Sequence, residues 1–219
     1  MKHPKVLVSA VSGMGKTTLL KDLEEVLVFS RDGKPYPYAQ PHVNIPDFVK
    51  IAEVIEAFNT KIPAYKERFG KVPKIIAIDS LSTILLDIET SCLQRIANYP
   101  YAEVGKEIAM LVRYLEALSE QFTLVVLSHS HHNEGTGSYN LVNAGGSYGK
   151  KGGFYSEVNY AISMSIDGSK RKIHCNNPTL LARASHGGFP DSVESKDFSL
   201  QKYLETLYGL SDEAESWAI

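Results

Sequence analysis

A glycine-containing segment near the start of the chain has the residue types and the spacing of a phosphate-binding loop. Residues 10–17 read Ala-Val-Ser-Gly-Met-Gly-Lys-Thr, the Walker A spacing with alanine where the first glycine usually stands. Glycines let backbone N–H groups curl around phosphates without Cβ clashes. The ammonium of Lys16 would lie between the β- and γ-phosphates, and the hydroxyl of Thr17 would bind Mg²⁺. We therefore predict binding of ATP with Mg²⁺. The residues expected to contact the nucleotide are Ser12, Gly13, Met14, Gly15, Lys16, Thr17 and Thr18.

A phosphate-binding loop needs a carboxylate at the end of a neighbouring strand, where it orders the water shell of the metal ion. Asp79 closes the apolar run within segment Lys74–Ser80. An aspartate in this place can also cap the helix that follows it. Because a Walker A segment precedes it in the chain, we favour the metal role, and Thr17 and Asp79 are the predicted metal-binding residues.

The elements that must position these residues alternate between strands and helices along the chain. Short apolar runs predict buried parallel strands, and apolar residues at helical spacing predict the helices between them. This alternation is typical of an α/β fold with a mostly parallel twisted sheet, helices on both faces and here a C-terminal antiparallel hairpin. The predicted strands are Val6–Ala10, Val26–Ser30, Lys74–Ser80 and Phe122–Ser128, the predicted helices are Thr17–Val26, Ile45–Phe58, Ser82–Ile96, Ala102–Glu120 and Leu200–Leu207, and the hairpin joins Glu157–Ile166 to Arg171–Cys175.

Composition excludes several classes of protein. The 219 residues fit one domain, 1–219, and two cysteines are too few for a disulfide framework, which favours a reducing compartment. The N-terminus has no signal-peptide core, and no apolar run approaches the roughly 20 residues needed to cross a bilayer. We expect a soluble, cytoplasmic protein. A net charge of −2 is unlike that of a generic nucleic-acid coat, so nucleic-acid binding would need a local patch.

Segment 130–153 shows no periodicity and contains seven glycines. A structureless stretch of about 24 residues is uncommon in a compact domain unless it is functional or disordered. Glycines keep such a loop mobile, tyrosines can stack on bases, and lysines can pair with phosphates. From composition alone, a DNA-binding loop and a surface insertion are equally good interpretations. The candidate DNA contacts are Tyr139, Tyr148, Lys150 and Lys151.

The chain resembles the RecA-like P-loop ATPases, and in particular the small phage-encoded RecA-like proteins of the Sak type, which are linked to single-strand annealing and recombination. Four stretches carry the resemblance, in the family's order: the loop 10–17, the strand ending at Asp79, the strand that precedes His129, and the glycine-rich loop that enters Phe154–Val158. The resemblance implies a Mg-dependent ATPase with single-stranded DNA on segment 130–153. It also implies a homo-oligomer with the nucleotide near the subunit interface, and a single-strand-binding protein as a partner.

The resemblance assigns roles to three further residues. The family's catalytic glutamate, at the end of the second strand, matches Asp32, whose side chain is one methylene shorter, so we expect slow turnover. A turn-forming aspartate is an equally good interpretation. The family's polar sensor of the γ-phosphate, often glutamine, matches His129. Arg183 stands where relatives have a basic residue that reaches a neighbouring subunit's nucleotide. The predicted catalytic residues are therefore Lys16, Asp32 and His129.

Two other clusters have plainer interpretations. Residues 129–134 contain three histidines and a glutamate but lack the ligand spacing of a structural zinc site. The resemblance also implies basic residues on the C-terminal hairpin that can reach the nucleotide of a neighbouring subunit, and the run Lys170–Lys172 lies at the predicted hairpin turn. For this run we favour the plainer interpretation, a solvated turn. The chain also starts directly at its first predicted strand, without the segment by which larger relatives polymerise, so we expect no stable filament.

Two other functions stay open at this point. In a nucleotide-gated interaction module, ATP would order segment 130–153 for a protein partner, with little hydrolysis. A small-molecule kinase would need an arginine-rich lid over the phosphates, and segment 130–153 contains no arginine.

Overall fold

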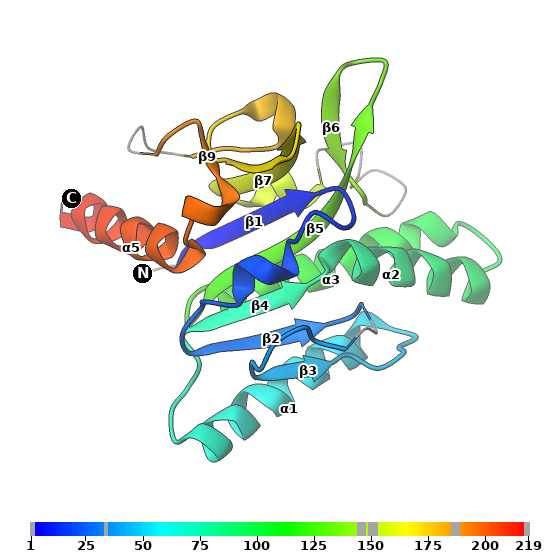
Figure 1. Cartoon of the computed structure of the whole chain (residues 1–219). Helices are drawn as coiled ribbons and strands as arrows, with labels where there is room; N and C mark the ends of the chain where they lie inside the picture. Colours follow the sequence, from blue (N-terminus) through cyan, green and yellow to red (C-terminus); the bar gives the residue numbers. More distant parts are fainter. Residues whose placement is uncertain (1–2, 33–34, 144–147, 149–152, 185–188, 217–219) are drawn as a thin grey trace.

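A single twisted sheet forms the centre of the protein in the computed structural model (Figure 1). The structure describes residues 3–32, 35–143, 148, 153–184 and 189–216, with side chains up to residue 208. Among these residues nine strands form the sheet in the order β3-β2-β4-β5-β1-β7-β8-β9, with β6 paired to β5. No helix within them is long and apolar enough to cross a membrane.

Six strands run parallel, and three antiparallel strands complete the sheet. The parallel strands are β1 (Lys5–Ala10), β2 (Val26–Ser30), β3 (His42–Asn44), β4 (Ile75–Asp79), β5 (Thr123–Asn133) and β7 (Tyr160–Asp167). The antiparallel strands are β6 (Ser138–Leu141), β8 (Lys170–His174) and β9 (Ser192–Glu194). The α-helices are α1 (Ile51–Phe69), α2 (Leu81–Arg95), α3 (Pro100–Leu118) and α5 (Leu200–Ser216), and the short 3-10 helices are η1 (Thr17–Leu20), η2 (Gly153–Glu157), η3 (Pro178–Leu180) and η4 (Ser195–Asp197).

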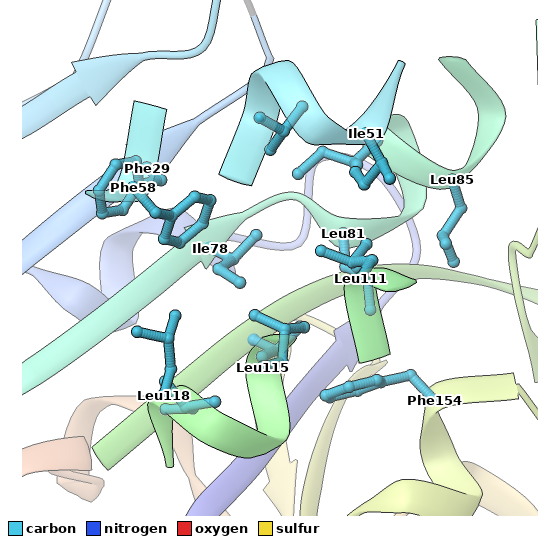
Figure 2. Close-up of a cluster of buried hydrophobic side chains, with 14 of the residues drawn as sticks. Phe29, Ile51, Phe58, Ile78, Leu81, Leu85, Leu111, Leu115, Leu118 and Phe154 are labelled. Carbon is cyan, nitrogen blue, oxygen red and sulfur yellow. The ribbon is translucent and has the colours of Figure 1, made fainter. Parts of the chain in front are cut away.

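The sheet has two buried faces because alternate residues of a strand point to opposite sides. One face packs against α1, α2 and α3, and its core includes Phe29 and Phe58, whose rings stack with centroids 3.9 Å apart (Figure 2). The other face packs against η1 and α5 through residues such as Val8, Leu20 and Leu204. These layers confirm the predicted α/β fold with helices on both faces, the fold of P-loop nucleotide-binding domains.

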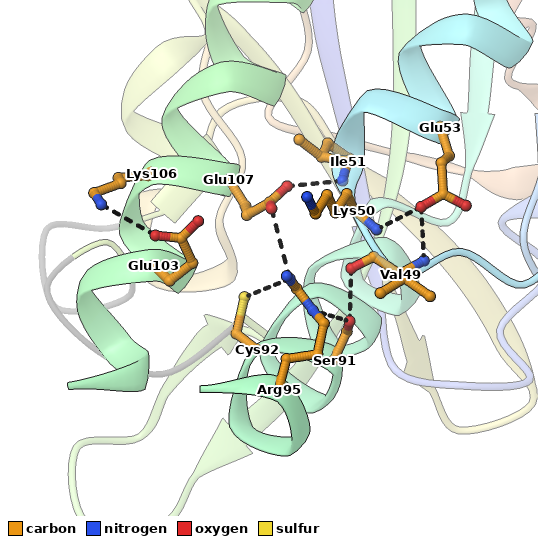
Figure 3. A network of polar contacts seen from close by, with 10 residues as sticks. All are labelled: Val49, Lys50, Ile51, Glu53, Ser91, Cys92, Arg95, Glu103, Lys106 and Glu107. Carbon is orange, nitrogen blue, oxygen red and sulfur yellow. Dashed lines mark hydrogen bonds and ion pairs between the residues drawn. The ribbon is translucent and has the colours of Figure 1, made fainter. Parts of the chain in front are cut away.

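Polar side chains hold the three helices of the first face together (Figure 3). The buried carboxylate of Glu107 accepts a hydrogen bond of 2.7 Å from the N–H of Ile51, the first residue of α1, and lies 3.6 Å from Arg95 of α2. Glu53 accepts from the N–H of Lys50 at 2.9 Å. Since the first N–H groups of a helix have no partner within it, these carboxylates fix where α1 begins.

The predicted helix Thr17–Val26 is wrong in length, because the structure has only the 3-10 turn η1. The chain leaves the helical conformation before Glu25, whose φ is +51°, and Val26 already pairs with Ile75 in the sheet. The leucines at helical spacing still face the core, since Leu20 and Leu23 are buried. The phosphate-binding loop is therefore followed by one helical turn, and a long helix dipole does not contribute to it.

The predicted helix Ile45–Phe58 is displaced, since α1 begins at Ile51 and ends at Phe69. Ile45 is still extended beside β2, where its N–H donates to the Ser30 carbonyl at 2.7 Å. A residue before proline disfavours the helical region, and Pro46 follows here. The predicted helix Leu200–Leu207 is too short, since α5 begins at Leu200 but continues to Ser216. Apart from segment 130–153, the other predicted strands, helices and hairpin match the structure to within a few residues.

The interpretation of segment 130–153 as a continuous loop is wrong for its first half. Strand β5 continues to Asn133 and pairs with β6 from Ser130↔Leu141 to Asn133↔Ser138. This β5–β6 hairpin stands out from the sheet (Figure 1). Apolar alternation is missing because most of the hairpin's side chains do not face a core. Residues 144–147 and 149–152 lie outside the described residues.

Candidate nucleotide-binding site

The predicted nucleotide-binding and metal-binding side chains Lys16, Thr17 and Asp79 meet at the carboxyl edge of the parallel strands. Ala10, the last residue of β1, is paired in register with His129 of β5, and β4 ends at Asp79. Ligands of parallel sheets bind at this edge, where loops leave adjacent strands. The loop 11–16 leaves β1 there, beside the end of β4 and the place where β5 stops pairing with β1 at His129.

Two glycines give the loop its shape. Gly13 has φ of +80° and Gly15 has φ of +93°, a region that costs an L side chain roughly 1–2 kcal/mol. A Cβ on Gly13 would meet no atom within 4 Å, so the space beside this part of the loop is open. An open, glycine-lined concavity fits the approach of phosphate groups to the backbone.

Lys16 places a buried ammonium group at this concavity. Its side chain is 6% exposed, and Nζ lies 3.0 Å from the Ala10 carbonyl and 3.1 Å from Nδ1 of His129. An ammonium has only donors, so Nδ1 of His129 accepts this hydrogen bond and the neutral ring carries its proton on Nε2. The predicted catalytic lysine and the predicted sensor are thus in direct contact. Such a buried cation suits an anionic ligand.

The two predicted metal-binding side chains are also in contact. The hydroxyl of Thr17 donates to Oδ2 of Asp79 at 2.7 Å, and Asp79 is buried. A hydroxyl and a carboxylate are hard oxygen ligands of the kind that Mg²⁺ takes, with water and phosphate completing its shell. The donor set therefore fits Mg²⁺. Within the described residues no cluster of three His, Cys, Asp or Glu side chains is arranged for a metal ion.

Two tyrosines that the sequence did not indicate lie beside this pair. The hydroxyl of Tyr38 donates to the backbone carbonyl of Thr17, and the ring of Tyr36 contacts that of Tyr38 edge-on at 5.1 Å. Burial raises the pKa of Tyr38 to about 12, and the nearby charge of Asp79 adds to the shift. The hydroxyl therefore remains a donor at neutral pH and holds Thr17, the candidate metal ligand, through its carbonyl. The only signal in the sequence is a Pro-Tyr-Pro-Tyr run after β2.

Asp32, the candidate for activating water, is exposed two residues beyond β2. Its neighbour Arg31 donates its backbone N–H to the Asp79 carbonyl at 2.7 Å, so this turn borders the candidate metal ligands. The Arg31 side chain forms ion pairs of 2.7 Å with Asp87 and Asp47. Asp32 thus lies at the same edge of the sheet as the phosphate-binding loop.

Arg183 is engaged within its own chain. Its Nη2 donates to the carbonyls of Tyr155, at 2.8 Å, and Val158, and its guanidinium carbon lies 4.6 Å from the centre of the Tyr155 ring. These contacts hold η2, where segment 130–153 ends. The predicted role toward a neighbouring nucleotide would require this side chain to leave its carbonyl partners.

The candidate DNA contacts fall in three different environments. Tyr139 is half-buried on β6 of the projecting hairpin, with its ring 5.2 Å from that of His132. Tyr148 packs against the core, and burial raises its pKa. Its hydroxyl has no hydrogen-bond partner among the described residues. Lys150 and Lys151 lie outside the described residues. Tyr139 is therefore better placed than Tyr148 for stacking.

Comparison with known proteins agrees with this geometry. The model of the AAA domain family matches residues 2–182, most of the chain, including the loop 10–17, Asp79 and His129. A search of curated proteins finds no match. The matched region contains the phosphate-binding loop, the Thr17–Asp79 contact and the parallel sheet that brings them together. The chain therefore belongs to the AAA domain family, and its domain is a nucleotide-binding ATPase of the P-loop type.

Proposed function

We propose that this ATPase uses Mg-ATP, binds single-stranded DNA and assists recombination or strand annealing. The nucleotide part of the proposal assigns a role to each buried group. Lys16 would neutralise the β- and γ-phosphates, and Thr17 and Asp79 would hold Mg²⁺, which would supply positive charge to the leaving phosphate oxygens. Tyr38 would keep Thr17 in place through its carbonyl. Asp32 is the candidate that orients the attacking water.

The DNA part rests on one observation, the continuity of β5. The strand carries His129, which accepts a hydrogen bond from Lys16, and then continues directly into the β5–β6 hairpin. The N–H of Val142, just after β6, donates to the His129 carbonyl at 2.8 Å. A change at the γ-phosphate that moved His129 would therefore act on both strands of the hairpin. This supports a nucleotide-dependent ligand on the hairpin.

The chemistry of the hairpin favours single-stranded nucleic acid as that ligand. It presents aromatic rings at Tyr139 and His132, with exposed polar side chains at His131 and Asn140. Stacking on such rings tolerates any base sequence, which suits single strands. Lys150 and Lys151 in the segment that follows would pair with phosphates. A local patch of this kind is compatible with a net charge of −2.

Fluorescence anisotropy with labelled single- and double-stranded DNA, with and without Mg-ATP, tests the proposal. We expect single strands to bind more tightly when Mg-ATP is present. Replacing Lys150 and Lys151 by alanine should make the log–log salt slope shallower, by roughly 0.7 for each lost contact. Tyr139→Ala should weaken binding by on the order of 1–3 kcal/mol with the slope unchanged. Tyr101→Ala is the matched control, since Tyr101 is 50% exposed on α3.

Absence of single-strand binding under all these conditions would refute the DNA part and favour a nucleotide-gated interaction module. Equal losses in Tyr139→Ala and Tyr101→Ala would remove the hairpin as the DNA site. Binding that is independent of Mg-ATP would refute the coupling through β5.

A further inference from the structure

The three basic residues Lys170–Lys172 at the start of β8 do not all point to the same face of the sheet. Successive side chains of a strand point to opposite faces, so Lys170 and Lys172 share one face and Arg171 lies on the other. Lys170 forms an ion pair of 2.5 Å with Glu194 of β9, and Lys172 forms one of 2.6 Å with Asp167 of β7. The hydrogen bond from Lys170 holds the pKa of Glu194 below its usual value. Both lysines are therefore neutralised within the sheet.

Arg171 forms no ion pair with any described residue. Its position follows from the register of β7. Ala10, the last residue of β1, pairs with Met164, and β7 continues to Asp167 beyond the end of β1. Arg171 pairs with Ile166 in this extension. The tip of the β7–β8 hairpin thus stands at the level of the phosphate-binding loop of the same chain.

The guanidinium of Arg171 reaches that loop. Its Nη1 lies 3.2 Å from the position that a Cβ on Gly15 would occupy. Glycine at this position therefore does two things: it allows the φ of +93°, and it leaves room for the arginine. The concavity then has a buried ammonium at Lys16 and an exposed guanidinium at its rim.

We propose that Arg171 is a second phosphate-binding cation, supplied to the nucleotide by the same chain that holds it. The inference rests on the proposed ATP site and adds a residue to it. A guanidinium offers paired donors that match phosphate oxygens, and an exposed one can move a short distance to meet them. A cation supplied in this way would act in a monomer, whereas one reaching a neighbouring subunit requires assembly.

Titration of a fluorescent ATP analogue with Mg²⁺ tests the proposal on the full chain. Arg171→Ala should weaken binding by on the order of 10-fold, the loss expected for one charge-assisted hydrogen bond in a partly exposed place. Arg171→Lys should recover part of the loss. Lys170→Ala is the matched control, because it removes one positive charge from the same hairpin and leaves the loop contact intact. Circular dichroism melts check that all variants fold.

A mixing experiment identifies which chain supplies the arginine. Lys16→Met removes the phosphate-binding lysine but keeps Arg171. When the Lys16→Met chain is added in excess to the Arg171→Ala chain, the affinity of the Arg171→Ala chain for the ATP analogue should stay unchanged. Recovery of binding in the mixture would overturn the proposal and assign Arg171 to a neighbouring subunit's site.

The remaining outcomes separate the two proposals. Suppose that the wild-type chain binds Mg-ATP and that Arg171→Ala binds it as tightly as the wild type, or no more weakly than Lys170→Ala does. This result would refute the role of Arg171 and leave the proposed ATP site standing. Wild-type chain that binds no Mg-ATP would refute the proposed ATP site, and the role of Arg171 with it.

Discussion

Replacing Lys16 by methionine removes the ammonium group while keeping most of the aliphatic stem. In the structure this group is buried and hydrogen-bonded to the Ala10 carbonyl at 3.0 Å and to His129 at 3.1 Å. Its loss removes those hydrogen bonds but also removes the cost of burying a charge, and the two effects oppose each other. We therefore expect the free energy of unfolding of the ligand-free variant to lie within about 1 kcal/mol of the wild-type value.

The large effect should appear only when nucleotide is present. A ligand at 100 times its Kd stabilises the folded state by about 2.7 kcal/mol. For a domain of this size, 1 kcal/mol corresponds to a Tm change of roughly 2–4 °C. Mg-ATP at that concentration should therefore raise the Tm of the wild type by about 5–11 °C. In Lys16→Met the rise should nearly vanish, because the site has lost its buried cation.

Differential scanning fluorimetry over a range of Mg-ATP concentrations measures both quantities. The matched control is Lys21→Met, which removes an exposed lysine just after η1 and should keep the wild-type response. A Tm rise in Lys16→Met equal to that of the wild type would refute the assignment of residues 10–17 as the phosphate site. A ligand-free Tm lowered by much more than 5 °C would instead show that Lys16 is mainly structural.

Two further predictions concern the metal and the core. Asp79→Asn keeps the shape of the side chain but removes its charge, so ATP hydrolysis should be abolished while nucleotide binding in EDTA persists. Wild-type turnover, measured by phosphate release, would refute the metal role of Asp79. Phe154→Ala should lower the free energy of unfolding in urea by about 3–5 kcal/mol, because Phe154 is 2% exposed in the core, whereas Tyr99→Ala, at 86% exposed, should change it by less than about 0.5 kcal/mol.

The sequence was sufficient for the features that depend on residues close together in the chain. Apolar runs marked β1, β2, β4 and most of β5, because a strand buried on both faces needs apolar residues throughout. The Walker A spacing marked the phosphate-binding loop, since glycines and a lysine must recur at set positions to surround a phosphate. Asp79 could be named because it ends an apolar strand, and a parallel sheet brings such ends to one edge.

Local patterns failed where a tertiary contact opposed them. The leucines after Thr17 have helical spacing, yet pairing of Val26 with Ile75 ends the helix after one turn. The hairpin of β5 and β6 has no apolar alternation, because it projects from the sheet and is held by backbone hydrogen bonds. Backbone hydrogen bonds form with almost any side chain, so the amino-acid composition does not predict this pairing.

The chain by itself was sufficient to predict the fold class, the phosphate-binding loop and the contact between Thr17 and Asp79 as candidate metal ligands, because each depends on a local spacing or on a strand end. The tertiary structure alone decided which distant side chains complete the site. Lys16 meets His129 through the register of β1 with β5, and Arg171 reaches Gly15 through the register of β1 with β7. A shift of one residue in either pairing would turn these side chains to the opposite face, and no local spacing specifies such a register.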